Sequence, residues 1–313
     1  MTAIDLSAWD TLVRADVIQG YTESPVVLDG SFIKKVHTNQ AAMIFPKLNA
    51  RVPTNKADGG EVLGFNAETE PGVQLAPDSP LKMHEDIPDS DMNTQQMSLE
   101  SDLAKRLGID LRYGHDNRLI AFATNQGIAR SSFAGRVQWQ NVPATQDTTE
   151  KRGDAAGEVL SDILKNFANA QVGSPTRKYV VFEPDLFFNL MNSKFVRSRD
   201  FTTDTDNAGT VMRIRFGGLT VTSSVSIFNS NQIGDPGELL DGAPAKYLAD
   251  FTTERVSGCA WSEDAMGVGY VEPLSVRSSY EASREGLLIR ARTQFGTTST
   301  QPTGFSYVSE VIA

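Results

Sequence analysis

The sequence predicts an α+β protein in which helices pack against mixed sheets. Two observations carry this prediction. Leucines recur at every fourth position from Leu99 to Leu111, a spacing typical of one face of a helix. Later segments, such as 178–182 (KYVVF) and 209–228, are rich in β-branched residues and indicate strands. Because strand and helix alternate along the chain, we expect sheets that are covered by helices.

Length and cysteine content limit the classes of protein that fit. A chain of 313 residues can bury a full hydrophobic core in one large or two modest domains. Its single cysteine, Cys259, cannot form an internal disulfide or a cysteine-based zinc site, and it suits a reducing cytoplasm. No run approaches the length of a membrane span, and the amino terminus has no signal-peptide pattern, so we expect a soluble, cytoplasmic protein.

The charge balance bears on nucleic-acid binding. The chain has 39 acidic and 29 basic residues, which gives a net charge of −10. A protein that grips nucleic acid through its phosphates needs the opposite sign. We therefore expect any contact with DNA to be loose.

The first part of the chain lacks the pattern of a self-contained domain. Residues 1–30 hold only scattered apolar side chains, which predicts an amino-terminal arm, and residues 31–46 predict strands that lead into a loop. Residues 47–92 are rich in Pro, Asp and Gly and poor in large apolar side chains. Such a segment cannot form a core within its own length. We expect it to project as a long hairpin that packs on another chain.

Two helices should follow, the first of them long. The leucine series places it within residues 93–131, where Gly108 and Gly114 would weaken or bend it. The second helix follows a polar linker and should be capped by Asp154 and end before Gly173. Its core-facing stripe consists of Leu160, Ile163, Leu164 and Phe167.

The carboxyl half predicts strands interrupted by one more helix. The strand at 178–182 leads to Pro184, a residue suited to the first turn of a helix. Within 209–228, the pair Gly217–Gly218 should turn one strand into the next. Closing strands are expected at 271–282, 287–295 and 305–312.

Histidines and acidic residues predict no metal site. The three histidines form no pair at metal-ligand spacing, which favours surface or hydrogen-bonded roles for His37, His84 and His115. One acidic stretch could collect a divalent ion, but a solvated face within a flexible, proline-broken segment fits it better. This stretch consists of Glu85, Asp86, Asp89 and Asp91.

Other motifs also fail as catalytic or cofactor sites. The segment 204–209 (DTDNAG) begins like a calcium loop, yet Arg215 stands where a bidentate glutamate is required. The segment 267–269 (GVG) precedes a strand and is predicted to be a turn, not a dinucleotide fingerprint. Cys259 lies in the apolar stretch GCAW and should be a buried, inert thiol. We therefore predict no catalytic, cofactor-binding or metal-ligating residues.

A set of arginines leaves two interpretations open. These side chains either pair with the chain's own surplus of carboxylates or pair with carboxylates of a neighbouring subunit. The set comprises Arg112, Arg118, Arg130, Arg136, Arg197 and Arg199.

Several motifs, in order, are similar to those of one family. Gly209, Val211 and Ile214, followed by FGGLTVTSS, are similar to its Gly-x-Val-x-x-Ile-x-Gly-Phe-x-Val-x-x-Ser pattern, with Gly-Phe altered here to Phe-Gly-Gly-Leu. KYVVFEPDLFFNLMN looks like its strand, proline and helix unit, and Phe295-Gly296 precede a proline-bearing turn and a last strand. RLGIDLRYGHDNRLIAFATNQG resembles a podovirus spine helix. Residues 31–313 thus resemble the major capsid proteins of tailed double-stranded DNA phages, with the Hong Kong 97 type fold.

The resemblance implies a division of the chain. It comprises an amino-terminal arm at 1–30, a strand and extended loop at 31–92, the spine helix and peripheral domain at 93–150, the axial domain at 151–269, and returning strands of the peripheral domain at 270–313. The resemblance gives no cross-linking role to Lys47 or Lys56, which match no motif.

The resemblance also implies a role and partners. The chain would be a non-enzymatic subunit that self-assembles, through a procapsid made in the host cytoplasm, into the icosahedral head of a virion. Its partners would be other copies in hexamers and pentamers, a scaffolding protein, a portal protein and a decoration protein. Contact with packaged DNA would be loose and non-specific, and neither membrane nor cofactor is implied.

Two alternatives remain open at this stage. An encapsulin-like nanocompartment shell would share the fold and hold enzyme cargo in place of a genome. A cytoplasmic α/β hydrolase or ligand-binding protein would be a different class, and a monomeric state in solution would favour it.

Overall fold

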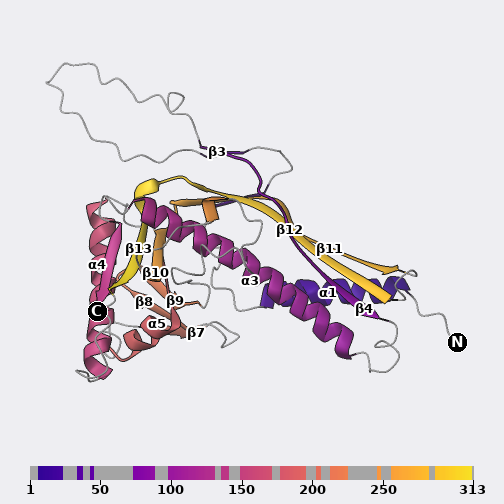
Figure 1. Cartoon of the computed structure of the whole chain (residues 1–313), viewed down its shortest axis with the longest axis horizontal. Helices are drawn as coiled ribbons and strands as arrows, with labels where there is room; N and C mark the ends of the chain where they lie inside the picture. Colours follow the sequence, from indigo (N-terminus) through magenta and orange to yellow (C-terminus); the bar gives the residue numbers. More distant parts are fainter. Residues whose placement is uncertain are drawn as a thin grey trace, which may run out of the picture.

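The computed structural model has two sheets joined by one long helix, α3 (Ser98–Ala129) (Figure 1). The α+β class predicted from the sequence is confirmed. The amino terminus lies near one end of the molecule and the carboxyl terminus near the other. The structure describes residues 6–23, 34–37, 43–45, 73–88, 98–130, 135–140, 149–170, 177–194, 202–205, 212–224, 245–247, 255–281 and 286–311.

Helix α3 contacts both sheets, and its middle is buried on every side. It packs on β13 (Phe305–Val311) and β10 (Arg255–Ser262) of one sheet and on β4 (Leu81–Pro88) and β12 (Gly286–Ser299) of the other. All side chains from His115 to Thr124 are buried. Continuous burial of this kind requires partners around the whole helix, so α3 fixes how the two sheets lie relative to each other.

The seven-stranded sheet has helices on both faces. The side chains of Tyr179 and Val181 pack with α3, while Val180 and Phe182 face the opposite core formed with α4 (Thr149–Asn169) and α5 (Pro184–Met191). A strand that is buried on both faces has a nearly continuous apolar sequence, which explains KYVVF. The strand order is β5 (Arg136–Gln140), β13 (Phe305–Val311), β10 (Arg255–Ser262), β6 (Lys178–Phe182), β9 (Leu219–Ser223), β8 (Met212–Phe216) and β7 (Thr202–Thr205).

Several local predictions for this sheet are confirmed. Pro184 begins α5, and Leu160, Ile163 and Phe167 of α4 are fully buried. The glycine pair turns β8 into β9 with φ of 53° at Gly217 and 84° at Gly218, positive values that both positions of this hairpin turn require.

The start of α4 was predicted wrongly. The helix begins at Thr149, so Asp154 lies inside it and does not cap it. The Asp154 carboxylate instead accepts a hydrogen bond from the backbone N–H of Lys194 at 3.2 Å and lies 3.5 Å from the Lys194 Nζ. The side chain therefore ties α4 to the turn that follows α5.

The four-stranded sheet has the order β1 (Lys34–His37), β11 (Met266–Glu281), β12 (Gly286–Ser299) and β4 (Leu81–Pro88). The strands expected at 271–282 and 287–295 correspond to β11 and β12, which pair antiparallel. Two predictions are wrong here. Residues 267–269 are part of β11 and not a turn, and residues 81–88 belong to this sheet and not to a projecting hairpin.

The pairing of several other strands also differs from the predicted division of the chain. The strand β2 (Met43–Phe45) pairs with β3 (Val73–Leu75), while residues 46–72 and 89–97 lie outside the described residues. The last strand β13 and the strand β5 join the seven-stranded sheet. The sheets therefore do not follow the predicted boundaries at 150 and 270.

Residues 6–23 of the predicted arm form a helix, α1 (Leu6–Glu23), that packs on α3 and shares a core with it. Val13 and Val17 share a core with Leu107. The two helices meet at glycines, because a Cβ atom on Gly20 or Gly108 would lie only 2.1 or 2.2 Å from a carbonyl oxygen of the facing helix. A contact this close admits no side chain.

We predict that Gly108→Ala separates α1 from α3. The added methyl group would meet the Val17 carbonyl, and such overpacking costs about 1–3 kcal/mol of unfolding free energy. Gly114→Ala is the matched control, because a Cβ there meets only Leu81 side-chain carbons at 3.8 and 3.9 Å, and alanine favours a helix by about 0.5–1 kcal/mol. Urea unfolding compares the two. Equal stability would show that α1 does not pack closely.

Candidate assembly surfaces

A buried polar cluster joins α3 to the strand β11 of the four-stranded sheet. The His115 Nε2 lies 2.7 Å from the Tyr270 hydroxyl, and its Nδ1 lies 3.3 Å from the Asp116 Oδ1. The imidazole also stacks against Tyr270 and contacts Phe295, with ring centroids 5.7 and 4.5 Å away. The prediction that His115 is a hydrogen-bonded histidine is confirmed. It is a structural link between α3 and β11.

The same cluster extends to α1. The Arg112 Nε lies 3.4 Å from the Asp116 Oδ1, and the Arg112 guanidinium lies 5.4 Å from the centre of the Tyr21 ring. Burial raises the pKa of Tyr21 above its ordinary value, against the opposing effect of Arg112. The phenol therefore stays neutral at physiological pH, and the cation–π contact adds to the attachment of α1.

A second polar cluster holds residues 76–80, which connect β3 to β4. The Asp78 Oδ2 accepts a hydrogen bond of 2.5 Å from the Tyr247 hydroxyl and lies 2.7 Å from the Lys246 Nζ. The Tyr247 hydroxyl in turn accepts a hydrogen bond from Thr297 at 2.9 Å. Burial, and then the Asp78 charge, raise the pKa of Tyr247 well above its ordinary range. The phenol therefore remains a donor to Asp78.

Backbone groups of the same connection are also held. Arg118 donates to the Ser79 carbonyl at 2.9 Å, Gln294 donates to the Asp78 carbonyl at 3.1 Å, and the Asp78 N–H donates to the Phe295 carbonyl at 3.1 Å. The point at which the 46–72 segment joins the body is therefore fixed on α3 and β12. The partners of the Asp78 carboxylate, Lys246 and Tyr247, lie about 170 residues away, so no local pattern could reveal this cluster.

Four of the six arginines contact groups of this chain, and one of the four does so through a carboxylate. Arg112 pairs with Asp116. The other three donate to oxygens of this chain, at the Ser79 carbonyl for Arg118, the Phe305 carbonyl at 2.7 Å for Arg130, and the Ser309 hydroxyl at 3.0 Å for Arg136. Arg197 and Arg199 lie outside the described residues.

The remaining residues that were considered as metal ligands or reactive groups are dispersed over the chain. His37 lies in β1 and His84 is exposed on β4. Glu85 and Asp86 also lie in β4, so they are not part of a flexible segment as predicted. Asp89, Asp91, Lys47, Lys56 and residues 206–209 lie outside the described residues. Across the described part of the chain, no group of three or more His, Cys, Asp or Glu residues could hold a metal ion.

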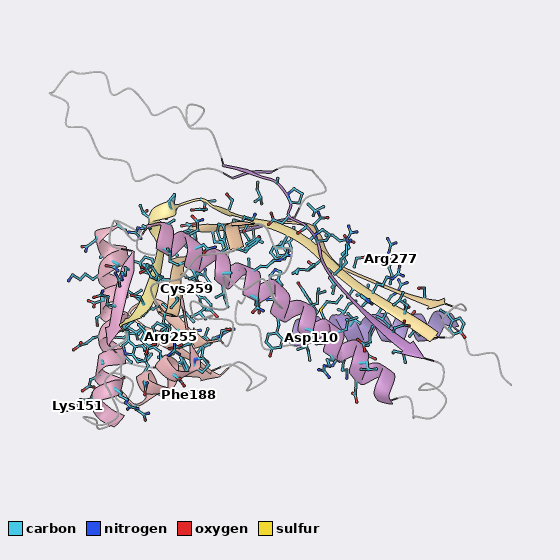
Figure 2. The ribbon with its side chains drawn as sticks, viewed as in Figure 1. Asp110, Lys151, Phe188, Arg255, Cys259 and Arg277 are labelled. Atoms are coloured by element: carbon cyan, nitrogen blue, oxygen red, sulfur yellow. The ribbon has the colours of Figure 1, made fainter. Side chains whose placement is uncertain are left out.

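Cys259 lies in the middle of β10 and is fully buried (Figure 2). Burial raises the pKa of its thiol to about 12, although a hydrogen bond with Thr124 acts in the opposite direction. The buried, unreactive thiol predicted from the sequence is confirmed. A nucleophilic role would need a lowered pKa and exposure.

The described surface exposes three large apolar side chains on three different elements. They are Ile18 of α1, Phe188 of α5 and Tyr280 of β11, each about half exposed or more. Single exposed apolar side chains are common, so none of them defines an interface by itself. No helix in the described residues is long and apolar enough to cross a membrane.

The two sheets, the long helix between them, and the strand pair β2–β3 form the Hong Kong 97 type fold of phage capsid proteins, as the sequence motifs predicted. The capsid structure of the cyanophage P-SCSP1u aligns with 91% of this chain and 88% of its own, at 14% identity and a TM-score of 0.60. The mature capsid of bacteriophage PhiM1 aligns with 90% and 86%, at 10% identity and a TM-score of 0.59.

A virus-like particle from Pyrococcus furiosus has a similar fold. It aligns with 96% of this chain and 99% of its own, at 10% identity and a TM-score of 0.53. No protein-family model and no curated protein sequence matches the chain. At identities this low, the structural similarity shows a shared fold and does not by itself show the function.

We predict that Tyr247→Phe loosens the connection between β3 and β4. The variant loses the hydroxyl between Asp78 and Thr297, and buried polar groups left without a partner cost about 1–3 kcal/mol. Hydrogen exchange should become faster in peptides that contain residues 76–80. Tyr113→Phe, on the half-buried side of α3, is the control. Unchanged exchange in both variants would mean that Lys246 alone holds Asp78.

We predict a loss of stability from Cys259 above pH 9. The ordinary thiol pKa is 9.0 and the folded value is about 12, so between these values only the unfolded chain releases the proton. The free energy of unfolding should therefore fall by up to about 1.4 kcal/mol per pH unit from this group.

Cys259→Ala removes that slope and costs about 1 kcal/mol at neutral pH, while Cys259→Ser costs more. Urea titrations between pH 8 and 10 test this. Rapid modification of the native thiol by a bulky reagent would contradict it.

Proposed function

We propose that this chain is the major capsid protein of a tailed phage, which self-assembles into the icosahedral head that encloses the genome. The observation that carries the proposal is the similarity to a phage capsid chain along nearly the whole length of both chains. A fold held in common over a single domain would be weaker support, because one domain often serves many functions.

The architecture supports a subunit that interlocks with its neighbours. The 27 residues between Phe45 and Val73 start and end at one short strand pair, and their sequence offers too few large apolar side chains for a core. The connection next to this pair is fixed by Asp78. A rigid root and a long connection suit a contact with another copy.

The finer assignments belong to the same proposal. The four-stranded sheet with α1 and most of α3 would be the peripheral domain, and the seven-stranded sheet with α4 and α5 the axial domain. The protein would be non-enzymatic. It would assemble in the host cytoplasm as hexamers and pentamers, with scaffolding, portal and decoration proteins as partners, and it would contact packaged DNA loosely.

An encapsulin-like nanocompartment shell is a second candidate. The similarity to a virus-like particle over 96% of this chain favours it. The content of purified particles separates the two candidates, since a head would hold nucleic acid in the infected cell and a nanocompartment would hold a cargo enzyme. The hydrolase or ligand-binding alternative gains no support from these similarities, which are with capsids and particles.

Expression of the full chain tests the proposal directly. Negative-stain microscopy and sedimentation should show closed particles, alone or after co-expression with a scaffolding protein from the same source. A protein that stays monomeric under both conditions would overturn the proposal.

We predict that residues 53–72 become protected from hydrogen exchange when the shell assembles. Their few large apolar side chains should be covered by an adjacent copy, while peptides from 76–80, already held by Asp78, should be protected in both states. The two peptides are measured in the same digests of free subunits and of particles. Equal exchange of 53–72 in both states would remove the interlocking role.

A further inference from the structure

The Asp78 carboxylate touches two parts of the chain that belong to different long connections. Asp78 itself lies in residues 76–80, which join β3 to β4. Both partners of its carboxylate lie in η5 (Ala245–Tyr247), a 3-10 helix of one turn. Within residues 225–254, between β9 and β10, η5 is the segment that the structure describes. A single helical turn is not stable by itself, so contacts with the rest of the chain must hold η5 in place.

Helix α3 and strand β12 supply part of these contacts. The Tyr247 ring is fully buried and packs edge-on against Phe122 of α3, with ring centroids 6.3 Å apart. Asn125 of α3 donates a hydrogen bond of 2.8 Å to the Lys246 carbonyl. On the other side, the Lys246 Nζ donates to the Thr297 carbonyl of β12 at 3.0 Å. The remaining contact is the Asp78 carboxylate, which accepts from both Lys246 and Tyr247.

Residues 76–80 are held on β12 by other groups of Asp78. Its backbone N–H donates to the Phe295 carbonyl, and its own carbonyl accepts from the Gln294 side chain, both at 3.1 Å. The chain passes so close to β12 that a Cβ atom on Gly296 would lie 2.6 Å from the Ala76 carbonyl oxygen. The backbone of Asp78 therefore anchors its own connection, and its carboxylate is free to join that connection to η5.

We infer that the Asp78 carboxylate couples the two connections, so that docking of η5 and docking of residues 76–80 favour each other. The Asp78 side chain is only 10% exposed. If η5 leaves, this carboxylate loses both of its donors inside the protein. If residues 76–80 leave, the ammonium of Lys246 and the buried hydroxyl of Tyr247 lose their acceptor. A buried polar group without a partner is costly, so each opening makes the other connection less stable.

This coupling bears on assembly but does not depend on it. The element with two states is η5, docked or undocked, and both connections bias it. If a neighbouring copy contacts the 46–72 segment as proposed, the ordering of β3 and residues 76–80 would also favour docked η5. The chain on both sides of η5 would then be restrained at the same time. Coupling between two sites is reciprocal, so a contact made near η5 would equally favour residues 76–80.

Two substitutions each loosen one connection without touching the other. Gln294→Ala removes the donor to the Asp78 carbonyl and has no contact with η5 among the described hydrogen bonds. Asn125→Ala removes the donor to the Lys246 carbonyl and leaves the contacts of residues 76–80 in place. Gln138→Ala, an exposed substitution on β5, is the matched control.

Each substitution is made in the wild-type chain and in an Asp78→Asn background, which removes the charge at nearly constant size. Hydrogen exchange is measured in the free, full-length subunit for peptides that contain residues 76–80 and residues 245–247. Circular dichroism and urea unfolding confirm that every variant folds. If Asp78→Asn does not fold, Lys246→Met replaces it, because it breaks the same link from the side of η5.

The coupling predicts effects at a distance that need the carboxylate. In the wild-type background, Gln294→Ala should speed exchange at 245–247 as well as at 76–80, and Asn125→Ala should speed exchange at 76–80 as well as at 245–247. The effect on the distant peptide should be about fivefold or more. In the Asp78→Asn background each substitution should act on its own peptide alone. The control should change neither peptide in either background.

Two results would overturn the inference. Unchanged exchange at the distant peptide in the wild-type background, for either substitution, would show that the two connections open independently. A distant effect that persists in the Asp78→Asn background would show that α3 or β12 carries the coupling instead of the carboxylate. Both results come from free subunits and leave the proposed function as it stands. Failure of the wild-type chain to form particles would contradict that function without affecting the coupling.

Discussion

The burial of the middle of α3 is the constraint on which the rest of the structure depends. Ten consecutive residues, from His115 to Thr124, lie inside the protein, so the helix cannot act as a spacer on the surface. The half that follows Leu119 packs in the core of the seven-stranded sheet, and the half that precedes His115 packs with α1 and the four-stranded sheet. Both cores are therefore built on one rigid element, and a shift of either sheet would uncover part of it.

Five of the buried residues in this stretch are polar, among them His115 and Arg118, whose contacts make the arrangement specific. His115, Asp116, Asn117 and Arg118 would each cost free energy if buried without a partner. His115 contacts the Tyr270 hydroxyl of β11, and Arg118 donates to the Ser79 carbonyl. Asp116 pairs within α3 with Arg112, whose guanidinium lies over the Tyr21 ring of α1. An apolar helix could slide or rotate at little cost. These polar contacts fix one register of α3 against its surroundings.

Local sequence patterns predicted the helices and strands better than they predicted which of these elements pack together. The apolar stripe of α4, the strand KYVVF, Pro184 and the glycine pair at 217–218 each act within a few residues, so the sequence suffices to place them. The packing of α1 depends on two glycines, Gly20 and Gly108, that meet across helices far apart in the sequence. Helix propensity alone makes a glycine within a helical pattern a weak point, whereas its missing side chain is what allows the contact.

The candidate functional features also differ in whether the local sequence predicts them. The buried Cys259 was predictable from its apolar neighbours, and the dispersed histidines from their spacing. The cluster around Asp78 was not, because Tyr247 lies 169 positions from Asp78. Residues 81–88 look like polar loop sequence since one side of β4 faces solvent, and only the pairing with β12 shows that Lys82 and His84 stand beside arginines.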